Sequence, residues 1–439
     1  MTKKLLFLLT VASFALTVQA GGLMTNTNYH IAFDRMMARG ASMEIDAAYS
    51  NPAGLAWGYD GFQMSLDFQK PWQNRDIKWN GQTFEGKASA PIVPALFASY
   101  KKDRWALSSM IGIVGSGGFV KYDQGVPMFN ALVAGLLQQN GINPGTYNID
   151  SEMKGKQYIY GGQLNFTYRL TDFLSAAVGL RANYYDGYYR GHVIADKHAQ
   201  LGTLASLELD VDQRGWGFTP LVSIDFHQGP LTIAARYEFR TKIETENKTN
   251  ELKAGLGQTL MQMMGATPEG QAKLQAIGST MGTYTNAYED GVKTRYDMPA
   301  LLSVAVGYEF TDKLRATAEY HFFDDKNAKM AGDRQKELKH GTHELQLGAE
   351  YDINDKFTVS LGGQRTDYGL SESYQQDTSF ACDSYSIGVG GAVNLTEKLR
   401  LNAGYFITIY SDYDKTASYG QETFSRTNNV IGVGFDYKF

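Results

Sequence analysis

Residues 39–57 read RGASMEIDAAYSNPAGLAW, a run of small residues that ends in the turn Asn51-Pro52-Ala53-Gly54. Pro52 fixes its own φ and biases Asn51 away from helix, and Gly54 permits a sharp turn. The stretch lies between a secretion signal and a long series of alternating strands. We therefore interpret it as a plug that enters a larger structure.

The N-terminus has the pattern of a secretory signal peptide over residues 1–20. Lys3 and Lys4 precede an apolar run from Leu5 to Val18, and Ala20 ends a small-residue exit. The run is short for a transmembrane helix. We expect export, followed by an N-terminal plug segment over 21–60 and a barrel over 61–439.

The charge composition argues against a nucleic acid partner. Without Lys3 and Lys4, 39 of the 41 basic residues remain against 46 acidic ones, and no basic patch stands out, so a nucleic acid partner is not expected. Cys382 is the single cysteine and has no partner for an internal disulfide. No later apolar run is long enough for a helical span, yet alternation with a period of two recurs throughout.

The last strand shows this alternation most clearly. Ile431, Val433, Phe435, Tyr437 and Phe439 alternate with small or charged residues up to the chain end. The same pattern predicts 14 strands. Their ranges are 61–70, 93–101, 104–116, 156–170, 173–190, 208–226, 231–246, 293–310, 313–325, 341–353, 356–366, 382–395, 398–412 and 425–439.

The connections between these strands alternate without exception between short and long. All tight turns thus lie at one end and all long loops at the other, which is typical of outer-membrane barrels with short periplasmic turns. An open sheet edge in lipid would leave backbone groups unpaired, so the sheet should close. The sequence predicts a 14-stranded antiparallel β-barrel in a Gram-negative outer membrane, contacting its lipid, with the N-terminus on the periplasmic side.

Several arginines fall on faces that should point into the lumen. Arg236, Glu238 and Arg240 alternate with apolar residues in the seventh strand, and a luminal arginine could bind an anionic head group. The alternative is an ion-pair network with luminal glutamates. The candidates for a head-group site are Arg181, Arg236, Arg240 and Arg315.

The two longest loops, 117–155 and 247–292, carry apolar residues at helical spacing. Such stripes above a pore could form a groove for an apolar ligand, or they could pack on each other as a cap. The groove candidates are Phe129, Leu132, Val133, Leu136, Leu256, Leu260 and Met264.

The third strand loses its alternation in a glycine-rich stretch. Clustered glycines weaken pairing and often mark a bulge or kink, which would open a gap in the wall. The alternative is a strand end that runs into its loop. The candidates for a lateral opening are Gly112, Gly115, Gly117 and Gly118.

No catalytic pattern is present in the sequence. His340 and His343 have loose metal-like spacing without further ligands, and no nucleophile elbow occurs. We expect no enzyme activity, no metal and no cofactor.

The chain resembles the outer-membrane transporters of long-chain fatty acids and hydrocarbons, the FadL and TodX type. The resemblance rests on Gly40-Ala41, Asp46-Ala47-Ala48, the Asn51-Pro52-Ala53-Gly54-Leu55 turn, the strand count and the two apolar loops after the third and seventh strands. It implies that residues before about 60 form a hatch inside the barrel, with Asn51, Pro52, Ala53 and Gly54 near its base. It also implies capture by the loops and sideways release through the third strand.

This resemblance predicts a monomeric channel for passive uptake of a hydrophobic small molecule, with long-chain fatty acids the first candidates. Two other classes stay open at this point. One is a structural or adhesive surface protein, and the other is a general porin, against which the plug argues.

Overall fold

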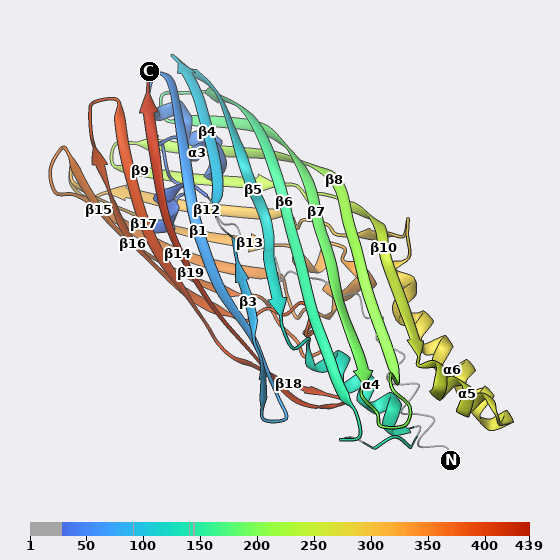
Figure 1. Ribbon diagram of the computed structural model, residues 1–439. Helices are drawn as coiled ribbons and strands as arrows, with labels where there is room; N and C mark the ends of the chain where they lie inside the picture. The colour runs from blue at the N-terminus through green and yellow to red at the C-terminus, as the bar shows by residue number, and fades with distance from the viewer. Residues whose placement is uncertain (1–28, 91, 140, 144) are drawn as a thin grey trace.

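The computed structural model describes residues 29–90, 92–139, 141–143 and 145–439. The predicted signal peptide and residues 21–28 of the predicted plug lie outside them. The described strands form one antiparallel sheet that closes on itself into a barrel of 14 wall strands (Figure 1). The first wall strands are β1 (Gly61–Trp79), β4 (Val93–Lys102), β5 (Trp105–Tyr122), β6 (Asn148–Arg169), β7 (Leu174–Asp196) and β8 (Ala205–Gln228).

The barrel closes where the first strand meets the last. β1 pairs with β4 on one side and with β19 (Gly420–Lys438) on the other, from Gln63↔Lys438 to Trp79↔Glu422. This closure leaves no open edge for lipid, as the alternation predicted. The strands before β19 are β12 (Leu301–Glu309), β13 (Leu314–Phe323), β14 (Thr342–Asp352), β15 (Phe357–Asp367), β16 (Ser384–Asn394) and β17 (Leu399–Tyr410).

Two wall strands are interrupted where the sequence suggested continuous ones. The predicted strand 231–246 is split into β9 (Leu231–Glu238) and β10 (Glu244–Leu256), and 293–310 into β11 (Lys293–Arg295) and β12. The inward row runs through Arg236 and Glu238 but resumes at Thr241, one residue out of phase. Lys242 and Arg240 are exposed, so the buried inward row does not continue through them.

The predicted connection over 71–92 is also not a loop. β1 continues to Trp79, and the short strands β2 (Gln82–Phe84) and β3 (Gly86–Ser89) follow and fold back on it. At the same end, β18 (Tyr413–Ala417) pairs with β19. The wall thus rises well beyond the span of about 10 residues that crosses a bilayer.

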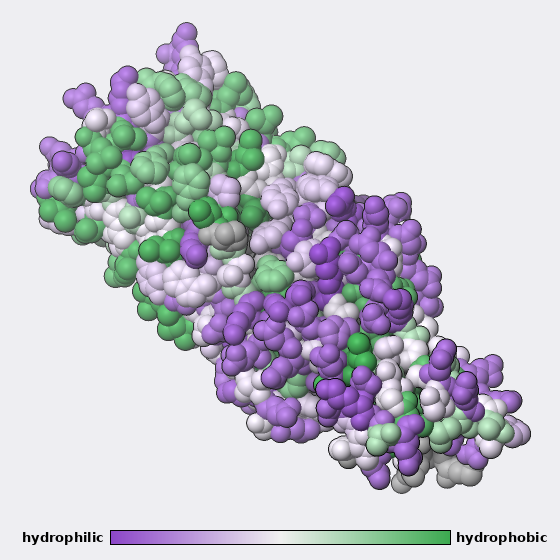
Figure 2. All heavy atoms as spheres, in the orientation of Figure 1, coloured by the Kyte–Doolittle hydropathy of each residue, from purple (hydrophilic) through white to green (hydrophobic). Residues whose placement is uncertain are grey.

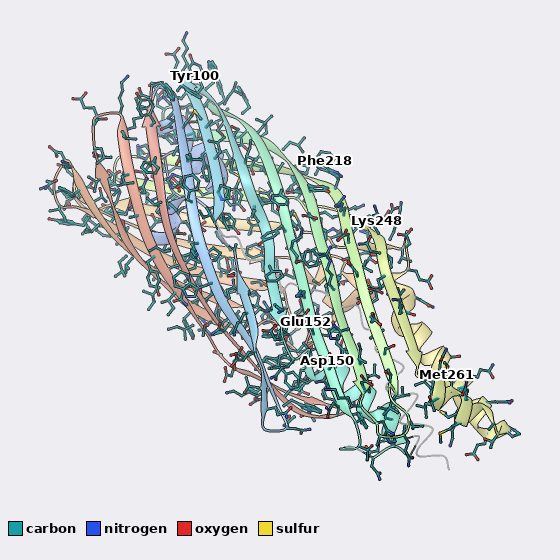
Figure 3. The ribbon with its side chains drawn as sticks, viewed as in Figure 1. Tyr100, Asp150, Glu152, Phe218, Lys248 and Met261 are labelled. Atoms are coloured by element: carbon teal, nitrogen blue, oxygen red, sulfur yellow. The ribbon has the colours of Figure 1, made fainter. Side chains whose placement is uncertain are left out.

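The outer face divides into an apolar and a polar half (Figure 2). Large apolar side chains are exposed near the short turns, such as Leu164 at 70% and Phe218 at 59%, while the surface beyond them is mainly hydrophilic up to a far tip of mixed character. In Figure 3, Tyr100 and Phe218 mark the apolar end, and Glu152 and Lys248 lie on the polar extension. An exposed apolar belt of this kind requires lipid around it. None of the described helices is long and apolar enough to cross a membrane.

Helices lie in the loops at the polar end (Figure 1). α4 (Pro127–Gln139) follows β5, and α5 (Gln258–Gly265), α6 (Pro268–Thr285) and η2 (Asn286–Tyr288) follow β10; η3 (Asp325–Asn327) and η4 (Ala331–Glu337) lie between β13 and β14. Because β10 continues to Leu256, the predicted helical stripe is wrong for Leu256, which belongs to the strand.

The N-terminal segment fills the short-turn end of the lumen. It contains α2 (Ile31–Met36), α3 (Ala47–Ser50) and η1 (Pro52–Trp57), and nearly all of its residues from His30 to Ala56 are buried. We call residues 29–58 the hatch. Its first helix approaches the wall so closely that glycines are required, because a Cβ on Gly362 would lie 1.9 Å from the Met36 carbonyl oxygen.

Candidate functional site

The two loop helices share one apolar cluster at the polar end of the barrel. Val133 and Leu137 of α4 and Leu260 of α5 are buried together with inner residues of β7 and β8. Phe129, Leu256 and Met264 pack against the same cluster. The loop cluster therefore brings together most of the groove residues predicted from sequence. Leu132 and Leu136 are half-buried on α4 and are not among its buried members.

Two larger clusters continue from there into the lumen. The upper luminal cluster contains Tyr122, Tyr189, Phe380 and Phe424, and the lower one reaches from Tyr374 to Leu55 of the hatch. Single aromatic residues connect the clusters. Phe129 packs against both the loop and the upper luminal cluster, and Tyr413 packs against both luminal clusters.

The chain of clusters ends at a weak place in the wall. β5 pairs with β4 up to Leu96↔Ile111 and with β3 from Ala88↔Val120, so the ladder on that side is interrupted between Ile111 and Val120. On its other side β5 shifts register against β6 between Ile113 and Gly115 and again between Ser116 and Gly118. Gly118 has φ +71°, which an L-residue adopts only with strain. We call this stretch the wall gap.

All four predicted opening glycines, Gly112, Gly115, Gly117 and Gly118, lie in the wall gap. β5 continues through them to Tyr122 instead of ending there. Beside them Ala90, Val93 and Ile113 form a small buried cluster, against which Tyr29 and Tyr158 pack. Tyr29 also packs against the lower luminal cluster. The apolar contacts thus run from the loop helices to the gap without interruption.

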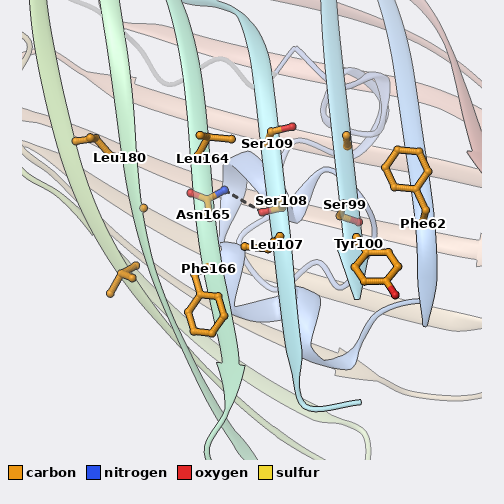
Figure 4. A pocket seen from close by; sticks show the side chains of 13 residues that line it. Phe62, Ser99, Tyr100, Leu107, Ser108, Ser109, Leu164, Asn165, Phe166 and Leu180 are labelled. Carbon is orange, nitrogen blue, oxygen red and sulfur yellow. Dashed lines mark hydrogen bonds between the residues drawn. The ribbon is translucent and has the colours of Figure 1, made fainter. Parts of the chain in front are cut away.

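An open groove of about 690 Å³ lies on the outer face of β1 and β4–β7, next to the gap on its short-turn side (Figure 4). Its walls carry exposed apolar side chains. Its floor is polar but satisfied, since Asn165 Nδ2 donates to Ser108 Oγ at 2.9 Å. The apolar lining residues include Phe62, Tyr100, Leu107, Leu164, Phe166 and Leu180.

The turn Asn51-Pro52-Ala53-Gly54 is fastened to the wall near the short turns. Asn51 Nδ2 donates to Asp225 Oδ2 at 3.1 Å, and the Ala53 amide donates to Ser223 Oγ at 3.1 Å. Thr167 and Ser175 hydroxyls donate to the Pro52 and Ala53 carbonyls. Gly54 is needed because a Cβ would lie 2.3 Å from the Ser42 carbonyl oxygen. This turn is the fixed base of the hatch.

Ion pairs hold the rest of the hatch. Arg39 donates to both oxygens of the buried Asp46 at 2.7 and 2.9 Å and to Glu44 at 2.7 Å. Its amide and that of Gly40 donate to Glu319 Oε2 on β13. Charge-assisted bonds of this number in a buried place give the hatch a defined position.

The arginines predicted as head-group ligands already have protein partners. Arg181 pairs with Glu238, and Arg236 donates to the Tyr49 carbonyl of the hatch. Arg315 pairs with Glu350 and Asp352, at 3.0 and 2.7 Å. Arg240 lies apart from them and donates to the Asn327 carbonyl. The geometry of Arg181 and Arg315 is that of the alternative, an internal ion-pair network.

Sequence reasoning also missed buried or half-buried arginines towards the polar end. Arg75 of β1 and Arg426 of β19 are register partners on the inner face, and Arg334 lies in η4. Arg75 fell in a predicted loop, which hid its inward direction. Burial lowers the pKa of the Arg334 guanidinium, because the charged form loses its hydration.

An acidic residue fixes α4 to the next loops. The Asp377 carboxylate accepts from the Met128 amide at 2.7 Å, at the start of α4, and from the Tyr419 hydroxyl at 3.3 Å. Burial raises the pKa of Asp377.

Among the residues that the structure describes, no group of three or more His, Cys, Asp or Glu side chains could hold a metal ion. The ring centres of His340 and His343 lie 5.1 Å apart.

The chain resembles the crystal structure of a Pseudomonas aeruginosa FadL homologue with a TM-score of 0.67 and 14% identity, covering 95% of this chain and 100% of that one. The chain therefore has the FadL fold. The Pseudomonas putida toluene transporter TodX gives a TM-score of 0.61 at 14% identity, with 96% and 100% covered.

Other comparisons agree with the FadL fold. The Ralstonia pickettii toluene transporter TbuX gives a TM-score of 0.55 at 14% identity, with 90% and 94% covered. A family model described as outer membrane protein beta-barrel domain matches residues 259–439, the second part of the FadL fold in this chain. No curated protein matches the chain significantly.

Proposed function

We propose that this protein is a FadL-type outer-membrane channel for passive uptake of hydrophobic compounds. The observation that carries the proposal is the unbroken series of apolar clusters from α4 and α5 to the wall gap, joined by Phe129, Tyr413 and Tyr29. An apolar molecule that moves along it stays out of water at every step. The similarity to the toluene transporters TodX and TbuX supports the same class of substrate.

Release sideways into the membrane fits the hatch and the gap together. The hatch fills the lumen at the short-turn end with buried ion pairs, which an apolar ligand would have to displace. The wall gap instead leads from the lower luminal cluster towards the lipid-facing side. The groove of Figure 4 lies on the same strands, so it offers an apolar surface to a chain that leaves the gap.

The direction of transfer determines which end of the barrel faces which side of the membrane. The loop helices face outside and capture the ligand, while the hatch and the short turns face the periplasm. Long-chain fatty acids are our first candidate ligand, because a flexible chain can follow a path that is narrow and bent. A closed hatch held by buried ion pairs argues against a general polar porin.

A covalent staple across the gap tests this proposal. Val93 and Ile113 belong to the same small cluster beside the gap, so Val93→Cys and Ile113→Cys can be bridged by a short bis-maleimide in a Cys382→Ser background. The control pair is Ser386→Cys and Thr408→Cys, cross-strand partners on β16 and β17. Uptake of a fluorescent fatty acid is measured in cells with an intact outer membrane.

We expect the bridged gap pair to lose most uptake while the unbridged protein and the bridged control keep it. Binding of the fatty acid to the purified protein should survive bridging, because the loop cluster is untouched. Full uptake through a bridged gap would refute sideways release. Loss of uptake by the unbridged protein would instead show that the residues themselves matter.

A further inference from the structure

The groove on the lipid-facing wall is built from two neighbouring rows of outward side chains (Figure 4). In the row nearer the gap, the register partners Ala98 and Ser109 are small, whereas Leu164 and Leu180 beside them are large. The hollow is therefore deepest over β4 and β5. The other row crosses five strands in register and consists of Phe62, Tyr100, Leu107, Phe166 and Val178.

The length of the groove suits a lipid chain. Neighbouring strands lie about 4.8 Å apart, so the row from β1 to β7 extends over about 19 Å. The hydrocarbon core of a bilayer is about 30 Å thick, so the chains of one leaflet fill about 15 Å. One acyl chain can therefore lie along the groove over most of its length.

The next row towards the short turns has the character of a membrane interface. Lys102, Trp105 and Tyr168 are register partners in this row. The Trp105 ring centre lies 5.6 Å from that of Tyr100, at the edge of the groove. Trp and Tyr side chains gather at the level of lipid head groups. The groove therefore begins directly on the hydrocarbon side of the head groups.

Two cations stand at this interface. Lys102 is exposed, and Arg104 follows in the turn between β4 and β5, with Asp103 between them. Arg104 is held in place, since its Nε donates to the Arg169 carbonyl at 3.0 Å and its Nη2 to the Leu170 carbonyl at 3.1 Å. Within the described part of the chain, neither cation has an acidic group within 4.0 Å.

The hollow and the two cations together match a lipid with a negatively charged head. A dent in the apolar belt that is not filled loses dispersion contacts on one side, and a hydrocarbon chain restores them. A phosphate at the level of the aromatic row can accept charge-assisted hydrogen bonds from the ammonium of Lys102 and the guanidinium of Arg104. A neutral lipid could fill the hollow but would not use the cations.

We propose that this groove binds a phospholipid of the leaflet at the short-turn end, with one acyl chain between the two rows and the phosphate at Lys102 and Arg104. A single outward row, that of Leu96 and Ile111, separates the groove from the wall gap. The bound lipid therefore borders the place where the gap meets the membrane. Because this lipid is a membrane component and not the transported compound, the site does not depend on the proposed function.

Native mass spectrometry of the purified full chain counts the lipids that stay bound. The protein is freed of lipid in a neutral detergent and titrated with dioleoylphosphatidylglycerol or with dioleoylglycerol, which has the same chains but no phosphate. Ser109→Trp fills the hollow, and Ile387→Trp, at an exposed lipid-facing position on β16, is its control. The head-group variants are Lys102→Gln and Arg104→Gln. Their control is Lys398→Gln, exposed in the short turn between β16 and β17.

We expect the wild type to bind one phosphatidylglycerol before any further lipid, and about 25-fold more tightly than dioleoylglycerol, with about fivefold from each cation. Lys102→Gln and Arg104→Gln should each weaken phosphatidylglycerol binding about fivefold and leave dioleoylglycerol binding unchanged. Ser109→Trp should remove this tight site for both lipids, while the two controls should resemble the wild type. Asp103→Asn should bind phosphatidylglycerol at least as tightly, because a negative charge beside the phosphate is gone.

Equal affinity for the two lipids, or an equal weakening by Lys398→Gln and Lys102→Gln, would overturn the head-group site. Wild-type affinity in Ser109→Trp would show that the lipid lies elsewhere, and would overturn the proposal as well. Heat-modifiable migration checks folding, and Ala98→Leu replaces Ser109→Trp if that variant does not fold. A protein that takes up fatty acid through the gap but binds no phosphatidylglycerol would refute the lipid site alone and leave the proposed function intact.

Discussion

The close contact between the hatch and the wall glycines allows a sharp test of how the hatch is held. We would replace Gly362 with alanine, because the new Cβ would lie 1.9 Å from the Met36 carbonyl oxygen and 2.3 Å from its carbon. Both atoms belong to the backbone, so no side-chain rotation relieves the overlap. The end of α2 must move away from β15. The neighbouring Gly363 is the matched control, since a Cβ there would meet only Ser386 O, at 3.5 Å.

Overpacking of this kind costs about 1–3 kcal/mol. If this whole cost weakens the contact between α2 and the wall, the fraction of molecules in which α2 has detached from the wall rises about 5- to 140-fold. Hydrogen exchange of the amides in 31–36 measures it, with 47–57 as an internal reference that stays fastened through Asp225 and Ser223. Ion conductance in planar bilayers is a second measure of how far the lumen opens when α2 detaches.

We expect Gly362→Ala to speed exchange in α2 and to raise conductance, while Gly363→Ala changes neither. Heat-modifiable migration in gels checks that both barrels are folded. Unchanged exchange in Gly362→Ala would show that the hatch is not held by contact at this wall. Equal acceleration in both variants would show that a general weakening of β15 is responsible.

Three further outcomes are expected. Arg39→Met leaves the buried Asp46 carboxylate unpaired and should weaken the hatch by about 3–5 kcal/mol, seen as faster exchange across 39–57; unchanged exchange would contradict this. Leu260→Ala should loosen the loop cluster by about 2–5 kcal/mol and reduce ligand capture, whereas Met263→Ala on the exposed side of α5 should do neither. Because burial raises the pKa of Asp377 above its unfolded value, the folded state binds the proton more tightly, so its contribution to stability is greatest below about pH 4 and is lost as pH rises through the folded pKa. Rate-corrected exchange in α4 should therefore be faster at pH 8 than at pH 4, and Asp377→Asn should reduce the difference.

The barrel could be predicted from sequence because its signals are local. Alternation in stretches such as 431–439 fixes which residues face lipid, and the order of short and long connections fixes which ends meet. The prediction failed where the wall leaves the membrane. Over 71–79 the inward row of β1 mixes Arg75 with Ile77, and its outward row is mostly polar, so no apolar period marks the strand, although its pairing with β19 continues to Trp79.

Partners across the lumen could not be predicted in the same way. Arg181 and Glu238 are 57 residues apart and meet only because β7, β8 and β9 are neighbours in register. The phase shift before Thr241 leaves Arg240 exposed and outside the buried row, and a single extra residue is invisible to an alternation count. The packing of the loop helices was easier to predict from sequence, since Val133, Leu137 and Leu260 are buried in one cluster, as their helical spacing implied.

The hatch and the ligand path can therefore be separated by experiment. The base of the hatch is fastened by Asn51 and Ala53, and α2 is held by the wall glycines, but Tyr29 alone among the described hatch residues packs against the small cluster at the gap. A ligand that turns sideways at the gap needs only the segment around Tyr29 to give way. We therefore expect Gly362→Ala to raise polar conductance without raising uptake of a fatty acid, and Tyr29→Ala to change uptake without raising conductance. If both variants changed both quantities together, transfer would require the whole hatch to move, and sideways release would lose its main structural reason.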